Sequence, residues 1–168
     1  MLAAVALAPW PRDLRDVAAA QAAPHTIFLV RHAERADGGA SAATASKDPG
    51  LSAAGRQRAT SLATLLKDAQ IRAIFVTEFK RTQETAAPLA QALGLTPAIV
   101  AADDTPALIA RLQKSAGNAL VVGHSNSVPE VIEALGVAAK VTIADDQFDN
   151  LFVVSPGSPR QLLRLHFR

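Results

Sequence analysis

Two histidines and two arginines follow three short apolar runs of the sequence. The runs are residues 26–30, 74–77 and 120–123, and the four side chains are those of Arg31, His32, Arg81 and His124. If the runs are parallel strands of one sheet, their carboxyl ends share an edge, and the four side chains meet in one crevice. Guanidinium groups pair with phosphoryl oxygens, and a neutral imidazole is a nucleophile toward phosphorus. The pattern therefore predicts a phosphate site that contains a histidine.

Each of these residues also has an ordinary structural explanation, such as a turn histidine or a solvated arginine. Burying Arg31 beside His32 without an anion, however, leaves its charge uncompensated. The positive charge of Arg81 at a helix amino end is unfavourable to the helix dipole. A bound phosphate makes the interaction at this helix end favourable. His124 lies in a Gly-His-Ser-Asn turn at 123–126, where glycine permits close approach and the following residues suit an oxyanion. The shared phosphate site is the interpretation that we favour.

A metal site is the competing use of two histidines. The chain has no cysteine, so zinc would need a third histidine or a carboxylate at close spacing. His25 and His166 lie outside the pattern, and arginines beside both candidate ligands repel a cation. We predict no metal and no cofactor, with a metal site as the alternative. The absence of cysteine also excludes disulfides and thiol nucleophiles.

The composition is that of one folded domain. With 168 residues, of which 49% are hydrophobic, the chain is long enough to bury a core. The net charge is only +2, without a run of Lys and Arg or an aromatic platform, which argues against nucleic acid and favours a small anionic substrate. No stretch after the amino-terminal segment is apolar enough to span a bilayer. Composition leaves the oligomeric state open.

Residues 1–24 form an alanine-rich segment that differs from the rest of the chain. Its apolar start at residues 2–10 resembles part of a secretory signal, although a basic beginning is missing and residues 11–16 are charged. We expect export, with a cytoplasmic location as the alternative, and a domain over residues 25–168.

From Thr26 onward, short apolar runs alternate with helical patterns, which predicts helices packed on a mostly parallel sheet. The expected strands are residues 26–30, 71–77, 97–100 and 119–122, followed by a hairpin of 151–154 and 162–167. The expected helices run from Ser52 to about 68, over 82–93 up to Gly94, from Asp104 onward, and over 128–135 with Ser127 as cap. Residues 36–49 are predicted to form a surface loop able to cover the site.

Four motifs resemble those of one protein family. In order, they are Arg31-His32-Ala33-Glu34 after the first strand, Leu51–Ala59, Thr77–Ala86 and Val121–Asn126. A fifth segment, Asp149–Val154, resembles the closing strand of small bacterial members. Together they resemble the histidine phosphatase superfamily, the phosphoglycerate-mutase-like group, over about residues 25–168.

The resemblance implies a three-layer α/β/α fold, a phosphohistidine intermediate, and no metal or organic cofactor. By position, His32 would be the nucleophile and His124 the second histidine of the pocket. The residues that would bind the phosphoryl group or line the pocket are Arg31, Arg35, Arg81, Ser125 and Asn126.

The chain departs from the family pattern in several places. Ala33 replaces the usual glycine, and Ser125 stands where one branch has aspartate. The insertion that carries the catalytic glutamate of the mutases is absent. The proton donor to the leaving group is therefore open. Glu34 is the first candidate for a catalytic acid, followed by Glu78 and Glu84, and each could equally be an ordinary surface carboxylate.

We predict a phosphomonoesterase that hydrolyses a phosphate ester, on a small molecule or a phosphoprotein, through phosphohistidine on His32. A phosphoglycerate-type mutase is an alternative within the same chemistry. A phosphate-binding or phosphopeptide-binding module with little turnover is another, because the acid is undetermined. The sequence does not name the substrate.

Overall fold

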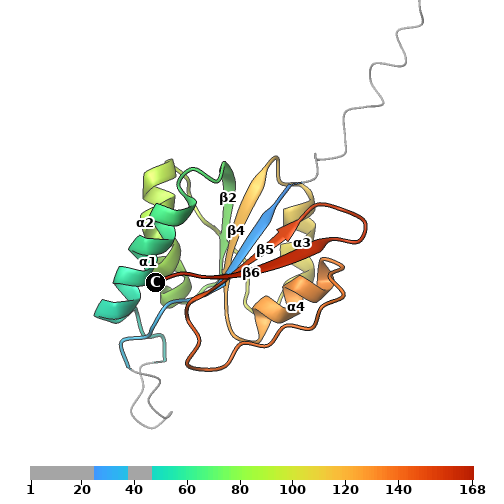
Figure 1. Cartoon of the computed structure of the whole chain (residues 1–168). Coiled ribbons are helices and arrows are strands. Elements are labelled where there is room, and N and C mark those ends of the chain that lie inside the picture. The colour runs from blue at the N-terminus through green and yellow to red at the C-terminus, as the bar shows by residue number, and fades with distance from the viewer. Residues whose placement is uncertain (1–24, 38–46) are drawn as a thin grey trace, which may run out of the picture.

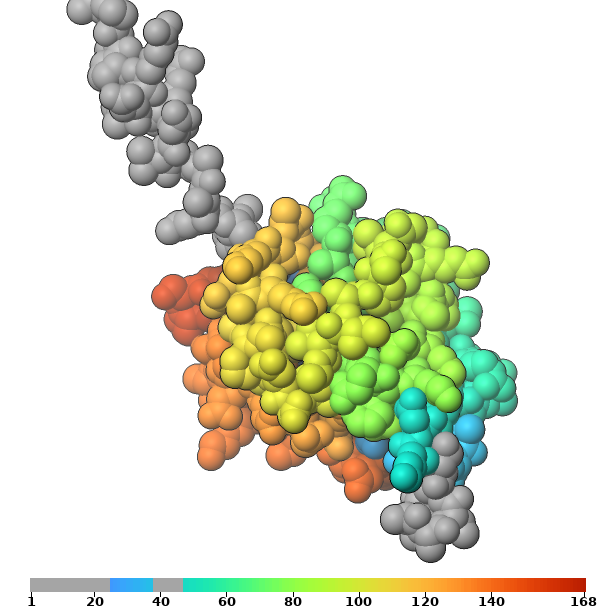
Figure 2. Space-filling view, turned by 180° about the vertical axis from the view of Figure 1, so that it is seen from behind, coloured from blue at the N-terminus to red at the C-terminus, as the bar shows by residue number. Residues whose placement is uncertain are grey.

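A six-stranded sheet lies between two pairs of helices in the computed structural model, which describes residues 25–37 and 47–168 (Figure 1). The strands are β1 (Ile27–Arg31), β2 (Ile71–Val76), β3 (Ala98–Ile99), β4 (Asn118–Gly123), β5 (Asn150–Ser155) and β6 (Gln161–His166). The helices are α1 (Ala53–Leu66), α2 (Lys80–Leu93), α3 (Thr105–Gln113) and α4 (Ser127–Ala134). Seen from behind, the surface is formed mainly by the chain from α2 to α3 (Figure 2).

The strand order is β3-β2-β4-β1-β5-β6. The pairs β1 with β4, β4 with β2, and β2 with β3 are parallel, whereas β5 runs antiparallel to β1 and forms a hairpin with β6. The predicted α/β fold, a mostly parallel sheet with an antiparallel carboxyl-terminal hairpin and helices on both faces, is confirmed.

Two apolar cores hold the layers together. One core packs α1 and α2 on the sheet and includes Leu62 and Leu89, whereas the other packs α3 and α4 on the opposite face and includes Leu112. Successive side chains of β1 alternate between them, because Leu29 belongs to the second core and Val30 to the first. A strand buried on both faces is a near-continuous apolar run, as the sequence 27–30 is.

The helix ends follow local chemistry in most places. Ser52 caps α1 by accepting a hydrogen bond from the Gly55 amide, and Asp104 caps α3 in the same way from Ala107. Gly94 ends α2 in the left-handed conformation, with φ 64°. The prediction of Ser127 as the cap of α4 is wrong: the helix starts at Ser127, whose hydroxyl instead accepts the backbone N–H of His124.

Two expectations fall on residues outside the described part of the chain. The signal-like segment 1–24 lies wholly outside it, and so do residues 38–46 of the predicted loop. Among the described residues, no helix has the length and apolar character needed to cross a membrane.

Candidate active site

Strand register brings the three predicted strand ends together. Arg31 at the end of β1 pairs with Gly123 at the end of β4, and the amide of His32 donates to the Gly123 carbonyl over 2.9 Å. On the other side of β4, Val122 pairs with Val76, the last residue of β2. His32, His124 and Thr77 therefore follow three adjacent strands at one edge of the sheet.

His32 is buried, with 4% of its surface exposed, and its ring has a defined tautomer. Its Nδ1 lies 2.8 Å from the carbonyl oxygen of Ala33. Because a carbonyl only accepts, Nδ1 carries the proton and Nε2 keeps its lone pair. Burial lowers the pKa of His32 to about 3, helped by the charges around it and opposed by the Ala33 hydrogen bond. The ring is therefore neutral near pH 7, as a nucleophile must be.

His124 faces His32, with ring centroids 5.3 Å apart and an edge-on arrangement. Its Nε2 lies 3.0 Å from the Thr77 hydroxyl, and its Nδ1 lies 3.5 Å from an Arg81 terminal nitrogen. Burial, followed by the charges of Arg81 and Arg31, lowers the pKa of His124 to about 4. In the absence of an anion this ring is neutral too.

Arg31 is buried and is held by the segment that precedes β5. Its Nη1 donates to the carbonyl of Ala144 over 2.9 Å and lies 3.4 Å from that of Gln147, and its guanidinium stacks on Phe148 at 4.3 Å. Its buried Nε finds no acceptor within the described residues. A buried guanidinium N–H without an acceptor costs free energy unless a bound anion accepts its hydrogen bond.

Arg81 repeats this arrangement from the first turn of α2. Its guanidinium lies over the ring of Phe79 at 4.2 Å, and a loose ion pair of 3.9 Å joins it to Asp48. Its buried Nε likewise lacks an acceptor in the part of the chain that the structure describes. Two guanidinium groups therefore hold an open donor at a buried site, which is the property that a bidentate phosphoryl site requires.

These side chains line one open pocket of about 330 Å³. Its lining residues are Arg31, His32, Arg35, Phe79, Arg81, Ala102, His124, Ser125, Asn126 and Asp145. All of the sequence-predicted site residues except Glu34 are among them. Arg35 pairs with Asp37, with 2.9 Å between Nε and Oδ1.

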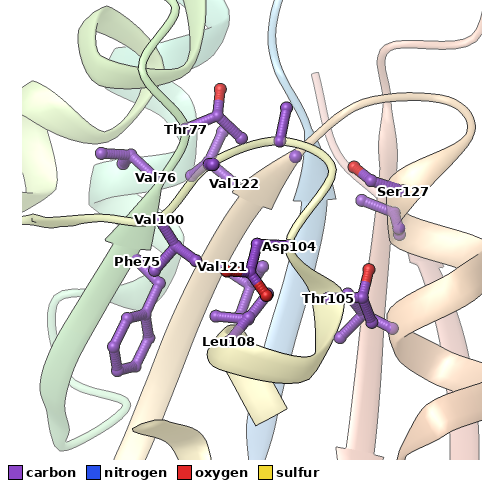
Figure 3. A pocket seen from close by; sticks show the side chains of 15 residues that line it. Phe75, Val76, Thr77, Val100, Asp104, Thr105, Leu108, Val121, Val122 and Ser127 are labelled. Carbon is purple, nitrogen blue, oxygen red and sulfur yellow. The ribbon is translucent and has the colours of Figure 1, made fainter. Parts of the chain in front are cut away.

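A separate cavity of about 20 Å³ lies in the core between β2, β4, α3 and α4 (Figure 3). Its walls are largely apolar and include Phe75, Leu108 and Val121, with room for about one water molecule. Thr77 and Ser127, whose hydroxyl groups bond to the ring and to the backbone amide of His124 respectively, also border it. The described residues that line this cavity include no histidine or arginine, so we assign the chemistry to the larger pocket.

A family model described as the histidine phosphatase superfamily, branch 1, matches residues 27–103. That stretch contains Arg31 and His32 after the apolar part of β1, and Arg81 in α2. The chain belongs to the histidine phosphatase superfamily. His124 lies beyond the matched stretch, and the structure is what places it beside His32. No curated protein matches the sequence significantly.

Solved structures share the fold of this histidine phosphatase superfamily member. SixA of Agrobacterium tumefaciens is 21% identical, with a TM-score of 0.62, over 84% of this chain and 98% of that one. The protein histidine phosphatase SixA in complex with tungstate is 16% identical, with a TM-score of 0.65, over 84% and 96%. A mycobacterial glucosyl-3-phosphoglycerate phosphatase in complex with VO3 is 16% identical, with a TM-score of 0.64, over 84% and 98%. At these identities the likeness concerns the fold.

Glu34, the first candidate acid, is not brought to the pocket of this superfamily member. Its carboxylate accepts from Arg58 Nε over 2.9 Å and from Nη2 over 2.7 Å, and it borders a different cavity on the α1 side. Burial favours its neutral form, but the hydrogen bonds from Arg58 outweigh this and hold the pKa of Glu34 below its usual value. An ionised carboxylate engaged by an arginine is unsuited to donate a proton.

The two later candidates for the acid also lie elsewhere. Glu78 accepts from the Ala102 amide over 2.9 Å, and Glu84 accepts from the Leu51 amide over 2.7 Å. Neither carboxylate lines the pocket. The bond to Glu84 fixes the segment at Leu51, which forms an isolated bridge with Arg35.

Sequence reasoning missed three side chains of this site: Thr77, Phe79 and Asp145. A signal existed for Thr77, because it directly follows β2 at the same sheet edge as the histidines. Phe79 stands two residues before Arg81, and nothing in its spacing indicates that it stacks on that arginine. Asp145 lies in the irregular segment between α4 and β5, for which no periodic pattern exists. Among the described residues, no cluster of three or more histidine or acidic side chains is arranged to hold a metal ion.

Proposed function

We propose that the protein is a phosphatase that removes a phosphoryl group from its substrate in two steps, through a phosphohistidine on His32. The observation that carries this proposal is the state of His32: a neutral ring with Nδ1–H bound to the Ala33 carbonyl and a free Nε2 lone pair, beside two guanidinium groups with open donors. Membership in the histidine phosphatase superfamily supports the same chemistry.

In the first step, Nε2 of His32 attacks phosphorus as the bond to the leaving group breaks and its electron pair departs with that group. Arg31 and Arg81 hold the equatorial phosphoryl oxygens, whose negative charge must be stabilised throughout the transfer. The Ala33 carbonyl fixes the ring and stabilises the positive charge that develops on the phosphorylated imidazole.

In the second step, water attacks the phosphorus of phosphohistidine. The N–P bond breaks, its electron pair returns to Nε2 of His32, and inorganic phosphate leaves. No group of the protein is consumed, so the resting state is restored.

His124 supplies a donor to the phosphoryl group in this mechanism. A bound dianion favours the protonated ring, in which Nδ1–H faces the anion and Nε2–H is accepted by Thr77. The Thr77 hydroxyl suits both states of the ring, because a hydroxyl group can donate and accept. Thr82, 2.9 Å from the Thr77 hydroxyl, extends this buried hydrogen-bonded chain.

The leaving group receives little help from the protein. Glu34 is bound to Arg58 and lies outside the pocket, so the first acid predicted from the sequence is not placed to protonate the leaving group. Leaving groups that need no proton from the enzyme are therefore favoured, such as an aryl alcohol or the imidazole of phosphohistidine. A similar fold solved with tungstate is named a protein histidine phosphatase, which agrees with the second class.

The test is steady-state hydrolysis of an aryl phosphate by the parent and by His32→Ala, with His166→Ala as the matched control. His166 is exposed and pairs with Asp149, away from the pocket. We expect His32→Ala to lose at least a thousandfold in kcat/KM and His166→Ala to stay within twofold. Turnover that persists in His32→Ala would refute the proposal, and vanadate binding by a parent without turnover would indicate a binding module instead.

A further inference from the structure

A single carboxylate, that of Asp145, is found among the described residues that line the phosphate pocket. A negative charge beside a site for a phosphate dianion works against binding, so its presence needs an explanation. No hydrogen bond or ion pair engages the Asp145 side chain within the described part of the chain. Its carboxylate can therefore accept a hydrogen bond from a substrate bound in the pocket.

The position of Asp145 is set by Arg31. Asp145 lies in the turn 144–147, closed by the Gln147 amide donating to the Ala144 carbonyl over 3.0 Å and by the Ala144 amide donating to the Gln147 side chain over 3.0 Å. Arg31 donates to the Ala144 carbonyl of this same turn. Burial lowers the pKa of Arg31, and the charge of Asp145 is the strongest influence that opposes it. The arginine that binds the phosphoryl group thus also holds the carboxylate nearby.

The pocket wall offers a second feature besides this charge. Phe79, which stacks on Arg81 and meets the His124 ring edge-on at 5.4 Å, also lines the pocket. An aromatic side chain in a pocket wall packs against a flat ring, and a carboxylate accepts an N–H or attracts a positive charge. A leaving group with its own negative charge is repelled by the carboxylate.

We propose that Asp145 determines leaving-group specificity, selecting a flat leaving group that carries an N–H, as the imidazole of phosphohistidine does, over an anionic one such as phosphoglycerate. This inference rests on the proposed phosphatase function and narrows its substrate class to phosphoramidates of ring nitrogens. It also gives the unpaired carboxylate a role at a site otherwise built for anions.

The transfer balances without a proton from the protein. In a substrate phosphohistidine protonated on the ring nitrogen that is not bonded to phosphorus, the N–P bond breaks and its electron pair stays on the departing nitrogen. Nε2 of His32 forms the new N–P bond. The substrate imidazole leaves neutral, with its remaining N–H donated to the Asp145 carboxylate.

The experiment compares Asp145→Asn with Asp146→Asn, a matched control. Asp146 is the next residue of the same turn, and its substitution by Asn removes the same charge. It borders the cavity on the α1 side, which Glu34 also borders, rather than the phosphate pocket. For the parent and both variants, kcat/KM is measured with a phosphohistidine peptide, with 3-phosphoglycerate and with an aryl phosphate. The readout is the ratio of phosphohistidine to phosphoglycerate turnover, which does not depend on the fraction of active enzyme.

We expect Asp145→Asn to lower this ratio at least tenfold, by losing phosphohistidine turnover and gaining phosphoglycerate turnover, while Asp146→Asn keeps the parent ratio within twofold. An equal ratio in Asp145→Asn and the parent would overturn the inference, and so would an equal decrease in both variants. If the parent hydrolyses the aryl phosphate while either result is obtained, only this inference fails. A parent that hydrolyses none of the three substrates removes the proposed function as well.

Discussion

Removing the hydroxyl group of Thr77 tests the role of His124 directly, because this hydroxyl is the buried hydrogen-bond partner of His124 Nε2 at 3.0 Å. Thr77→Val keeps the shape of the side chain and removes the acceptor. A hydrogen bond between neutral groups contributes about 0.5–1.5 kcal/mol, and one to a charged group about 1.5–3 kcal/mol. In our account His124 is neutral in the free enzyme and positive when the phosphoryl group is bound. Removing the hydroxyl therefore destabilises the bound state by about 1–1.5 kcal/mol more than the free enzyme.

That difference corresponds to roughly a tenfold loss in kcat/KM for an aryl phosphate. The free energy of unfolding should fall by about 1 kcal/mol, measured by urea denaturation. Thr77→Ser retains the hydroxyl and should recover most of the activity. Thr64→Val, the same change at an exposed position of α1, should leave the rate unaltered, since the Thr64 hydroxyl donates to the Thr60 carbonyl of the same helix. A Thr77→Val enzyme as fast as the parent would refute this role of His124.

Three further predictions concern other parts of the site. Glu34→Gln should keep hydrolysis of an aryl phosphate within about twofold, because Glu34 is outside the pocket; a loss of a hundredfold or more would restore it as the acid. Gly123→Ala should lower kcat/KM at least tenfold, because an added Cβ would lie 2.9 Å from the Ser127 hydroxyl that holds the His124 amide; wild-type kinetics would contradict this. The pKa values of about 3 for His32 and about 4 for His124 lie below that of an unfolded histidine. The unfolded chain therefore binds more protons as the pH falls, so the free energy of unfolding should drop by about 2 kcal/mol per histidine from pH 7 to pH 5. The double variant of these two histidines to Asn should show a flatter pH profile in chemical denaturation, and an unchanged profile would count against their burial as neutral rings.

The convergence of the main site residues is predictable from sequence because it depends on a general property of parallel sheets. Three apolar runs end in His32, Thr77 and His124, and parallel strands in register bring such ends to one edge. The same logic predicts the helices on both faces, because the runs alternate with helical patterns. Ser52 caps the start of α1 and Gly94 ends α2, as predicted, because capping depends on residues close together in the sequence.

The features that sequence did not predict depend on contacts between distant segments. Glu34 is two residues from His32, but Arg58 of α1 binds its carboxylate away from the pocket. Asp145 reaches the pocket because Arg31 binds carbonyl groups of its turn, a contact across 113 residues of sequence that leaves no local signal. Ser127 has the right residue type for a helix cap, and the strand-to-helix turn uses its hydroxyl for the His124 amide instead.

The central claim is that phosphorus becomes bonded to the His32 ring during turnover. The most direct measurement mixes the protein with a labelled aryl phosphate, quenches within milliseconds in base, and maps the label by peptide mass spectrometry. The account predicts a base-stable, acid-labile phosphoryl group on the peptide that contains His32, present in the parent and in His166→Ala and missing in His32→Ala. A label found on any other residue would contradict the account. Rapid turnover without any label on His32 would also contradict it.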